Sequence, residues 1–324
     1  MIEYHLGLGR VFPFRGLASF DELLRTLTNW GRWGSDDEKG TLNYITSETR
    51  RRAAGLVRQG KTFSLAIPIR HGSGPQGGGA RINPLHLMTA TGCDPTSRVD
   101  LGRNTRYVDD VLVMMVQGGT QWDALCHVYY DDRLYNGFAA TQIDSRGAHR
   151  GGIDKVHADF VSRGVLLDVA RAQGVDCLPA GYAITTADLE ATASRQGVQV
   201  VAGDIVLIRT GQMSTVGDFA SWEVFRGREA GLHWETAEWL HARRVAAVAA
   251  DNSMVEATGQ LPNVWVPFHM LALCNLGLHL GEFWYLEALA ADCAADGVWE
   301  CMLVAQALPI AGGTGSPVNP LALK

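Results

Sequence analysis

The residues whose types and spacing point most directly to chemistry lie between positions 117 and 127. This segment reads Gln-Gly-Gly-Thr-Gln-Trp-Asp-Ala-Leu-Cys-His. Gln117, Gln121, Asp123 and His127 share parity, so an extended backbone would place their side chains on one face. A carboxylate, an imidazole and two amides that converge at the end of a strand must satisfy one another, bind a metal ion or contact a substrate. Spacing alone leaves open both a functional site and a hydrogen-bonded polar turn.

The elements that position this segment follow from the apolar pattern. Residues 108–116 form an apolar run typical of a fully buried strand, and Gly118 and Gly119 allow a sharp turn directly after it. Further strands are predicted at 62–69, 164–169, 204–209, 246–250 and 301–307, and helices at 47–58, 186–196, 235–244, 267–275 and 285–295. This alternation predicts an α/β protein with a mostly buried central sheet. The glycine-rich residues 72–79 lack the features of a phosphate loop and are interpreted as a mobile loop or lid.

The composition excludes several classes of protein. The 324 residues include 28 Lys and Arg against 34 Asp and Glu, a net charge of −6, which argues against a nucleic-acid partner. No apolar run reaches the roughly 18 residues of a membrane span, and no signal peptide or basic amphipathic stretch is visible, so we expect a cytoplasmic protein without a membrane partner. The six scattered cysteines indicate free thiols. The low charged fraction of 19% indicates much buried surface, part of it between subunits.

The 117–127 segment resembles the metal-binding stretch of the cyclase family, which includes kynurenine formamidases, isatin hydrolases and related lactone hydrolases. The family pattern is His-x-Gly-Thr-His-x-Asp-x-x-x-His. This chain matches the pattern at Thr120, Asp123 and His127 but has Gln117 and Gln121 where the family has two ligand histidines. A subgroup of the family already has glutamine at the second of these positions. Other segments also resemble subgroup motifs, namely 33–43, 83–88, 135–137, 203–211 and 312–320, so the resemblance covers nearly the whole chain.

The resemblance also implies a fold and a set of site residues. It implies a swivelling β/β/α fold, and we expect a single cyclase-like domain over residues 1–324, with residues 1–60 as an N-terminal extension that packs on it. His269 and Glu282 match the His and Glu that complete the family site, and His279 is a weaker candidate. The catalytic residues are therefore predicted to be His127, Asp123, His269 and Glu282. The predicted substrate-binding residues are Gln117, Gln121, Trp122, Trp33 and His86.

The two glutamines leave the question of a metal open. Asp123, His269 and Glu282, helped by Gln117 or Gln121, would hold a divalent ion such as zinc or manganese, but an amide oxygen is a weaker ligand for these ions than an imidazole. With a metal, we expect a hydrolase that opens a cyclic amide or lactone, with His127 as general acid and base. Without one, the same residues suit a metal-independent lyase, dehydratase or cyclase that acts on an aromatic or polyketide-like intermediate, with the amides as donors to an oxyanion. A non-catalytic binding protein is a third possibility, disfavoured because so many costly buried polar groups are present together.

The expected partners are a small-molecule substrate and further copies of the chain. Trp33, Trp122 and Trp265 could supply flat apolar walls for a ring, although core packing is the alternative interpretation of each. Family members are commonly dimers or tetramers, so the resemblance implies a homodimer or homotetramer. Cys126 beside His127 does not predict a thiol–imidazole pair, because adjacent residues of an extended chain point to opposite faces.

Overall fold

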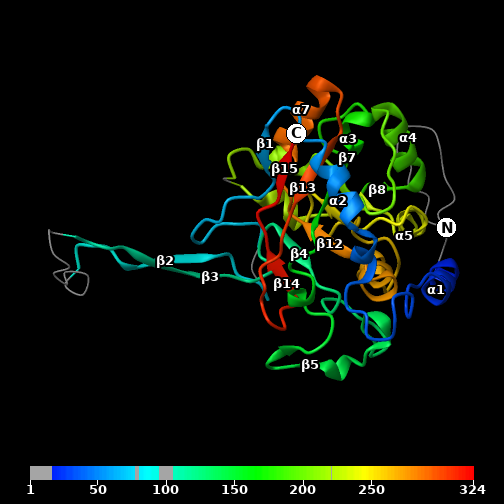
Figure 1. The fold of residues 1–324 in the computed structure, drawn as a ribbon, viewed down its shortest axis with the longest axis horizontal. Coiled ribbons are helices and arrows are strands. Elements are labelled where there is room, and N and C mark those ends of the chain that lie inside the picture. Colours follow the sequence, from blue (N-terminus) through cyan, green and yellow to red (C-terminus); the bar gives the residue numbers. More distant parts are fainter. Residues whose placement is uncertain (1–16, 77–79, 95–104, 220) are drawn as a thin grey trace.

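A computed structural model describes residues 17–76, 80–94, 105–219 and 221–324 (Figure 1). In this part of the chain, the main sheet has nine strands. Its central strands are parallel and its outer strands antiparallel, which gives a mixed α/β fold around a large curled sheet. In spatial order the strands are β1 (Thr62–Ser64), β15 (Leu321–Leu323), β13 (Glu300–Val304), β7 (Val161–Asp168), β9 (Ile205–Arg209), β11 (Ala247–Ala250), β12 (His279–Glu282), β4 (Gln121–Asp123) and β14 (Gly315–Pro317).

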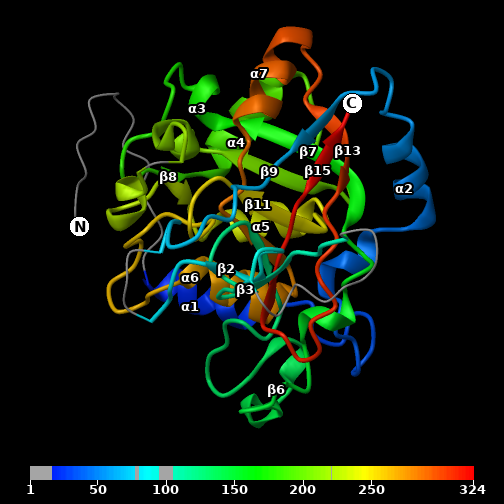
Figure 2. The same ribbon diagram turned by 90° about the vertical axis from the view of Figure 1, so that its left-hand side faces the viewer.

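The central strands are buried on both faces, as their continuous apolar sequences predict. In β9, Val206 and Ile208 face one hydrophobic core and Ile205 and Leu207 face the other. The first core also contains α4 (Thr186–Gln196), α5 (Thr236–Ala242) and α6 (Pro267–His269), and the second contains α7 (Glu287–Asp296). The remaining α-helices are α1 (Leu17–Thr26), α2 (Ser47–Ala54) and α3 (Val169–Ala172) (Figures 1 and 2). The predicted α/β class with a mostly buried sheet is therefore confirmed.

Local capping explains where several helices begin. Thr185 accepts a hydrogen bond from the backbone N–H of Asp188, and the Asp188 carboxylate accepts one from the backbone N–H of Thr185. This capping box sets the start of α4, and Gly197 in the left-handed conformation ends the helix. α6 continues into a π-helix over Met270–Leu276, a local widening that is common at functional sites. Each helix in the described ranges is too short or too polar to cross a membrane.

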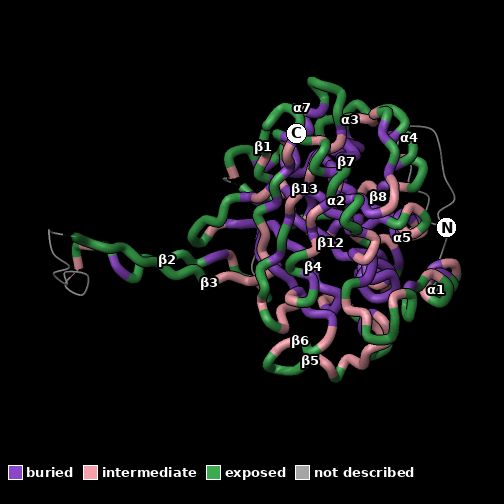
Figure 3. The backbone as a smooth tube through the Cα atoms, viewed as in Figure 1, coloured by how far each residue is buried: buried purple, intermediate pink, exposed green. Residues whose placement is uncertain are grey.

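One predicted strand is placed differently from the expectation. Residues 108–116 were expected to form a buried central strand, but β3 (Asp109–Val113) pairs only with β2 (Leu85–Ala90) in an antiparallel hairpin. This hairpin, which we call the arm, projects from the body of the molecule, and nearly every residue along it is exposed (Figures 1 and 3). Residues 108–116 include Asp109 and Asp110, two acidic side chains that a fully buried strand disfavours, and the inference that the surrounding chain buries this strand was wrong.

Two other pairs of short strands complete the described elements, β5 (Ile143–Asp144) with β6 (Gly147–Ala148) and β8 (Ala183–Ile184) with β10 (Gly231–Leu232). All six cysteines lie in the described ranges and are free thiols, as expected. The expected lid at 72–79 and the N-terminal extension at 1–60 lie partly outside the described residues.

Candidate metal and active site

The short strand β4 carries the centre of the site. It lies between β12 and β14 and is antiparallel to both, with Gln121 opposite Glu282 across the β12 pair. Because residues two apart on a strand share a face, Gln121 and Asp123 both point to the face that carries Glu282. Gly281 makes this packing possible, since a Cβ there would lie 2.6 Å from Ala249 Cβ. The parity argument is thus correct for positions 121 and 123.

Three potential metal ligands converge on this face. One ligand atom from each of Asp123, His269 and Glu282 lies within 4.8 Å of the other two, and all three residues are buried. His269 Nε2 is 3.4 Å from a Glu282 oxygen and 3.8 Å from Asp123 Oδ2. Gln121 Nε2 donates to Glu282 Oε2 at 2.7 Å and to Asp123 Oδ1 at 3.2 Å. The strands β4 and β12 and the helix α6 therefore bring residues 121, 123, 269 and 282 into one cluster.

A fourth acidic residue orients the histidine of this cluster. Glu256 accepts a hydrogen bond from His269 Nδ1 at 2.5 Å and from the His269 backbone N–H at 3.0 Å. It also accepts from the backbone N–H of Phe268 and from the Gln260 amide, each at 3.1 Å. With Nδ1 held in this way, Nε2 is the ring nitrogen that faces the two carboxylates. A carboxylate that holds the far nitrogen of a histidine is the usual outer partner of a metal ligand.

His127 and Gln117 lie at the rim of the cluster. His127 Nε2 is 3.8 Å from Asp123 Oδ1, and Gln117 Nε2 lies 3.4 Å from His127 Nδ1 and donates to Thr314 Oγ1 at 3.1 Å. A tight turn, closed by the His127 N–H to Ala124 carbonyl bond of 2.9 Å, returns His127 toward Asp123. Turns on both sides of β4, rather than a continuous extended chain, bring positions 117 and 127 to the cluster. His127 is 20% exposed while Asp123 is fully buried, so the cluster opens on the His127 side.

Burial dominates the electrostatics of the site. It raises the pKa of Glu282, and the neighbouring Asp123 carboxylate raises it further. Burial alone would lower the pKa of His269, but hydrogen bonds to Glu256 and Glu282 raise it to about 10. Burial lowers the pKa of His127, so its imidazole is neutral at neutral pH. The site thus combines a neutral histidine at the rim with carboxylates that share protons or a cation at the centre.

These donors fit a divalent cation. Asp123 Oδ2 and Gln121 Oε1 are buried and accept no hydrogen bond from any side chain or backbone group that the structure describes. An unsatisfied buried carboxylate oxygen is costly, and a cation would satisfy it. The oxygen and nitrogen of an amide are assigned from their hydrogen bonds, so a rotated Gln121 would offer its oxygen to the same centre. Two carboxylates, one oriented imidazole and one amide oxygen form a ligand set suited to zinc or manganese.

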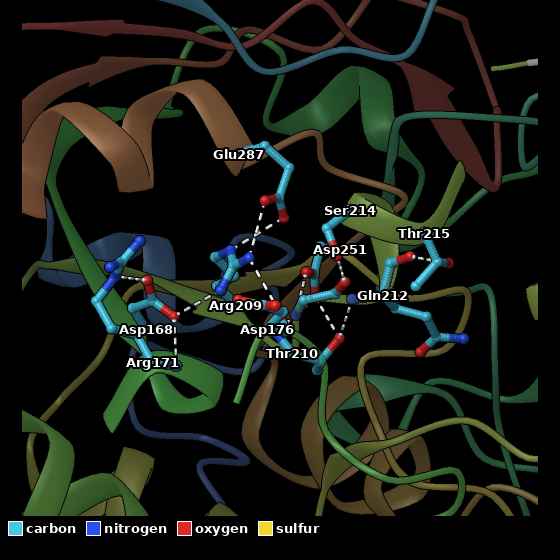
Figure 4. Close-up of polar contacts among 11 residues, drawn as sticks. Asp168, Arg171, Asp176, Arg209, Thr210, Gln212, Ser214, Thr215, Asp251 and Glu287 are labelled. Carbon is cyan, nitrogen blue, oxygen red and sulfur yellow. Dashed lines mark hydrogen bonds and ion pairs between the residues drawn. The ribbon is translucent and has the colours of Figure 1, made fainter. Parts of the chain in front are cut away.

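A second group of buried charges lies at the carboxyl ends of β7, β9 and β11, and it differs from this cluster (Figure 4). The Arg209 guanidinium binds Asp168 at 2.9 Å and both oxygens of Glu287 at 2.9 and 2.8 Å. The Asp251 carboxylate accepts from the Thr210 hydroxyl and from two backbone N–H groups. Each charge in this network is matched by a partner, which is the arrangement expected of a structural network. The Asp123 cluster instead contains two buried oxygens, Asp123 Oδ2 and Gln121 Oε1, that accept no hydrogen bond from the described residues.

The other predicted substrate contacts lie outside the cluster. The Trp122 ring is 0% exposed and stacks on Phe160 in the hydrophobic core, so the assignment of Trp122 to substrate binding was wrong. Since successive residues of a strand face opposite sides, the register that puts Gln121 and Asp123 in the site puts Trp122 in the core. Trp33 packs on Tyr44, and Trp265 is 82% exposed.

Two histidines were also considered from the sequence. His86 lies on the exposed arm, where its Nε2 pairs with Asp110 at 2.6 Å, and it is not a member of the cluster. His279 Nδ1 lies 2.9 Å from the Asp123 carbonyl oxygen, so this residue supports the backbone beneath the site rather than joining the ligands. Burial lowers the pKa of His279 to about 4, which keeps it neutral in that role.

Two residues near the site, Glu256 and Arg81, were not predicted from the sequence. Glu256 follows the apolar run 246–250, and a polar residue shortly after a buried strand is the only signal that could have indicated it. Arg81, in the loop before β2, is near enough for its positive charge to lower the pKa of both His127 and Glu282, though less than burial shifts either. Its loop is held at the site because Gln76 binds Asn83 twice and donates to the Gln117 carbonyl oxygen at 3.3 Å.

An apolar cavity of about 710 Å³ adjoins the site segment. Gly118, Gly119 and Thr120 line it from the site side. Phe219 lines it from a cluster of aromatic residues in which Phe225 packs edge-on against Phe283, the residue after Glu282. Aromatic surface near the cluster therefore comes from this group rather than from the tryptophans expected from the sequence.

Comparison with known proteins agrees with the geometry. Residues 63–257 match the model of the Cyclase family, described as "Putative cyclase". The crystal structure of a "novel cyclase" is 42% identical with a TM-score of 0.84, and the match covers 92% of this chain and 100% of that one. Isatin hydrolase A from Ralstonia solanacearum shares the fold at 21% identity and a TM-score of 0.59, over 86% of this chain and 97% of the other.

A "predicted metal-dependent hydrolase" from Bacillus stearothermophilus also shares the fold, at 16% identity and a TM-score of 0.51 over 82% and 98% of the two chains. The search of curated proteins finds no match.

Proposed function

Because this chain belongs to the Cyclase family, we propose that it is a metal-dependent hydrolase that opens a cyclic amide or lactone. The observation that supports the proposal most strongly is the buried convergence of Asp123, His269 and Glu282 within 4.8 Å, where Asp123 Oδ2 accepts no hydrogen bond from the described residues. These three residues, with Gln121, would hold the ion, and Glu256 would keep His269 oriented toward it. When bound, a divalent ion lowers the pKa of a water molecule toward ~7 and polarises a carbonyl group.

Residues of the chain would transfer the proton, orient the general base and bind the product. His127 is neutral at neutral pH and stands at the open side of the cluster, so it can accept the proton of the attacking water and return it to the leaving nitrogen or oxygen. The Gln117 amide, next to His127 Nδ1, holds the ring in place. Arg81 carries a positive charge on the same side, where it can bind the carboxylate that ring opening creates. Three of the solved structures with this fold are isatin hydrolases, and isatin is a cyclic amide, which makes it a suitable first substrate.

A second function is favoured by one observation, the position of the Gln121 amide. Its Nε2 donates to both Asp123 and Glu282 and so ties the two carboxylates together without an ion. In that state Glu282, with its raised pKa, and the neutral His127 form an acid and base pair suited to a metal-independent lyase, dehydratase or cyclase. An aromatic or polyketide-like intermediate would suit the apolar cavity beside the site.

Metal content and chelator dependence distinguish the two functions. The purified protein is analysed for bound metals, then stripped with a chelator and assayed on isatin, other cyclic amides and lactones. We expect ring opening that stops after stripping and returns with zinc or manganese, and that is lost in Asp123→Asn. The matched control Glu229→Gln, which changes a buried carboxylate outside the cluster, should retain the metal. Full turnover in chelator would refute the hydrolase proposal and support the metal-independent function.

A further inference from the structure

A cavity of about 480 Å³ lies between α1 and the loop that follows His127, apart from the metal cluster. Each of its two walls carries one acidic and one basic side chain. Asp21 and Arg25, one turn apart on α1, supply the first pair, and Asp131 and Arg133 supply the second. Pockets of about 300 to 1,000 Å³ are typical of small-molecule sites, so this cavity is large enough for a ligand.

These four charged side chains form no ion pair with any residue that the structure describes. The Arg25 guanidinium donates to the Asp21 main-chain carbonyl at 3.0 Å, and the Arg133 guanidinium donates to the Gly137 carbonyl at 3.1 Å. Both contacts leave the positive charges without a carboxylate. A ligand of one sign would be attracted by one member of each pair and repelled by the other, whereas a ligand that carries both charges is attracted by all four.

Two aromatic rings line the same cavity and are held in place by hydrogen bonds. Trp30 is 38% exposed, its Nε1 donates to the Cys274 carbonyl at 2.7 Å, and its ring packs on Gly137, where a Cβ would lie 3.4 Å from the ring. The Tyr130 hydroxyl donates to Asn275 Oδ1 at 2.6 Å. Fixed rings offer a flat apolar surface at little further cost in conformational entropy, which favours a ligand with a ring of its own.

We propose that this cavity binds an aromatic α-amino acid. The ligand carboxylate pairs with a guanidinium group of the cavity, the ligand ammonium pairs with a carboxylate, and the ring stacks on Trp30. An anion such as phosphate would lie against Asp21 and Asp131, and a simple amine would lie against the two arginines, so neither matches the lining. The site is separate from the metal cluster and does not rest on the proposed hydrolase function.

The walls of the cavity belong to segments that carry two residues of the metal site. Tyr130 lies three residues after His127, and Asn275 lies in the π-helix Met270–Leu276, which begins directly after His269. The hydrogen bond between Tyr130 and Asn275 joins these two segments, and α1 packs against the same π-helix. A bound amino acid therefore stabilises the segments that position both histidines, which makes the cavity an effector site.

Calorimetric titration of the full chain with L-phenylalanine tests the site. Three analogues each lack one feature: phenethylamine lacks the carboxylate, 3-phenylpropanoate lacks the ammonium and L-alanine lacks the ring. The variant R25Q/R133Q removes both cationic groups of the cavity. The matched control R146Q/R195Q changes two exposed arginines that do not line it. Ligands are added to about 10 mM, where millimolar binding is visible, and thermal unfolding shows whether each variant is folded.

We expect the wild type and the control to bind L-phenylalanine with a dissociation constant of about 1 mM or lower. Each analogue should bind the wild type about tenfold more weakly, and R25Q/R133Q should lose about the same factor for L-phenylalanine, because a charged hydrogen bond is lost. No binding by the wild type, equal binding of the analogues, or unchanged affinity in folded R25Q/R133Q would overturn the proposal. If R25Q/R133Q does not fold, the analogue series on the wild type still decides.

Hydrogen exchange tests the link to the metal site. With L-phenylalanine bound, amides of residues 128–133 and 271–276 should exchange about threefold more slowly, while exchange in β9 stays the same. Unchanged exchange in both segments would overturn the effector role. Neither readout needs a substrate or a metal, so failure here is distinguishable from failure of the hydrolase proposal.

Discussion

Replacement of Glu256 by glutamine tests whether His269 is a metal ligand whose ring is oriented by a hydrogen bond from Nδ1 to Glu256. The Glu256 carboxylate is fully buried and accepts the His269 Nδ1 bond at 2.5 Å. An amide in its place keeps the shape but removes the negative charge. It also turns one of two acceptor oxygens into a donor, which would face the Phe268 N–H or the imidazole. The Nε2 atom of His269 would lose both its fixed direction and part of its basicity.

The size of the effect follows from the contacts. Removing the outer partner of a metal-bound histidine typically lowers metal affinity 10–100-fold, about 1.4–2.7 kcal/mol. The Glu256–His269 bond is short, charged and fully buried, so we expect the upper end, about 100-fold. The unfolding free energy of the metal-free protein should also fall, by about 1.5–3 kcal/mol, since buried donors lose a charged acceptor.

Zinc affinity is measured by competition with a chromophoric chelator at pH 7.5, on metal-free wild type, Glu256→Gln and the control Glu229→Gln. The denaturant midpoint of each metal-free variant, measured beside it, separates lost affinity from lost folding. Zinc affinity within twofold of the wild type in folded Glu256→Gln would refute the assignment of His269 as an oriented ligand. An equal loss in Glu229→Gln would show that any buried carboxylate change weakens binding, and would refute the specific role of Glu256.

Four other variants test separate parts of the structure. Burial raises the pKa of Glu229 from 4.5 to about 7, so the folded protein retains a proton that the unfolded chain loses, and wild-type stability should fall as the pH rises from about 4.5 to 7. The free energy of urea unfolding should depend less on pH in Glu229→Gln than in the wild type. An unchanged dependence on pH would contradict this. Gln121→His should raise zinc affinity at least tenfold in the same chelator competition, because imidazole is the better ligand, and equal affinity would argue that position 121 does not face the ion. Arg81→Gln should weaken inhibition by the ring-opened carboxylate product about tenfold and leave KM for the neutral cyclic substrate unchanged, and unchanged product inhibition would exclude an anion-binding role. Gly281→Ala should lower the unfolding free energy by about 1–3 kcal/mol, because its Cβ would lie 2.6 Å from that of Ala249, and an unaltered Tm would contradict the packing at β12.

The position and type of the elements that lie in the two hydrophobic cores could be predicted from the sequence. The run 204–209 becomes β9, and the pattern at 186–196 becomes α4 with the same bounds, because local signals and burial agree there. The run 108–116 was expected to behave like β9, but it contains Asp109 and Asp110, and its residues 109–113 form β3 on the exposed arm. The one clear error in the fold thus occurs where two acidic residues interrupt the apolar pattern.

The site was predictable in part for a similar reason. Positions 121 and 123 share a face because β4 is extended, and the strand period fixes that relation locally. Turns bring positions 117 and 127 to the cluster. The conformation of these turns depends on hydrogen bonds to Thr314 and to the Ala124 carbonyl, which the two-residue period of a strand does not predict. Glu256 contacts His269, thirteen positions further along the chain, and no local pattern encodes such a contact.

The two glutamines change the ligands of the family site but leave the rest of its design in place. If the ion had been lost altogether, an uncharged residue at Glu256 or Asp123 would remove the cost of burying carboxylates among one another. The chain instead retains Glu256 behind His269 and leaves Asp123 Oδ2 without a hydrogen bond from the described residues, and a cation shared at the centre would satisfy that oxygen. Gln121 then acts as a neutral fourth ligand or as a clamp on the two acids, and its carbonyl oxygen, which accepts no hydrogen bond from the described chain, favours the former. A site with fewer imidazoles binds its ion more weakly, so metal exchange and chelator sensitivity should be more pronounced here than in relatives with the full histidine set.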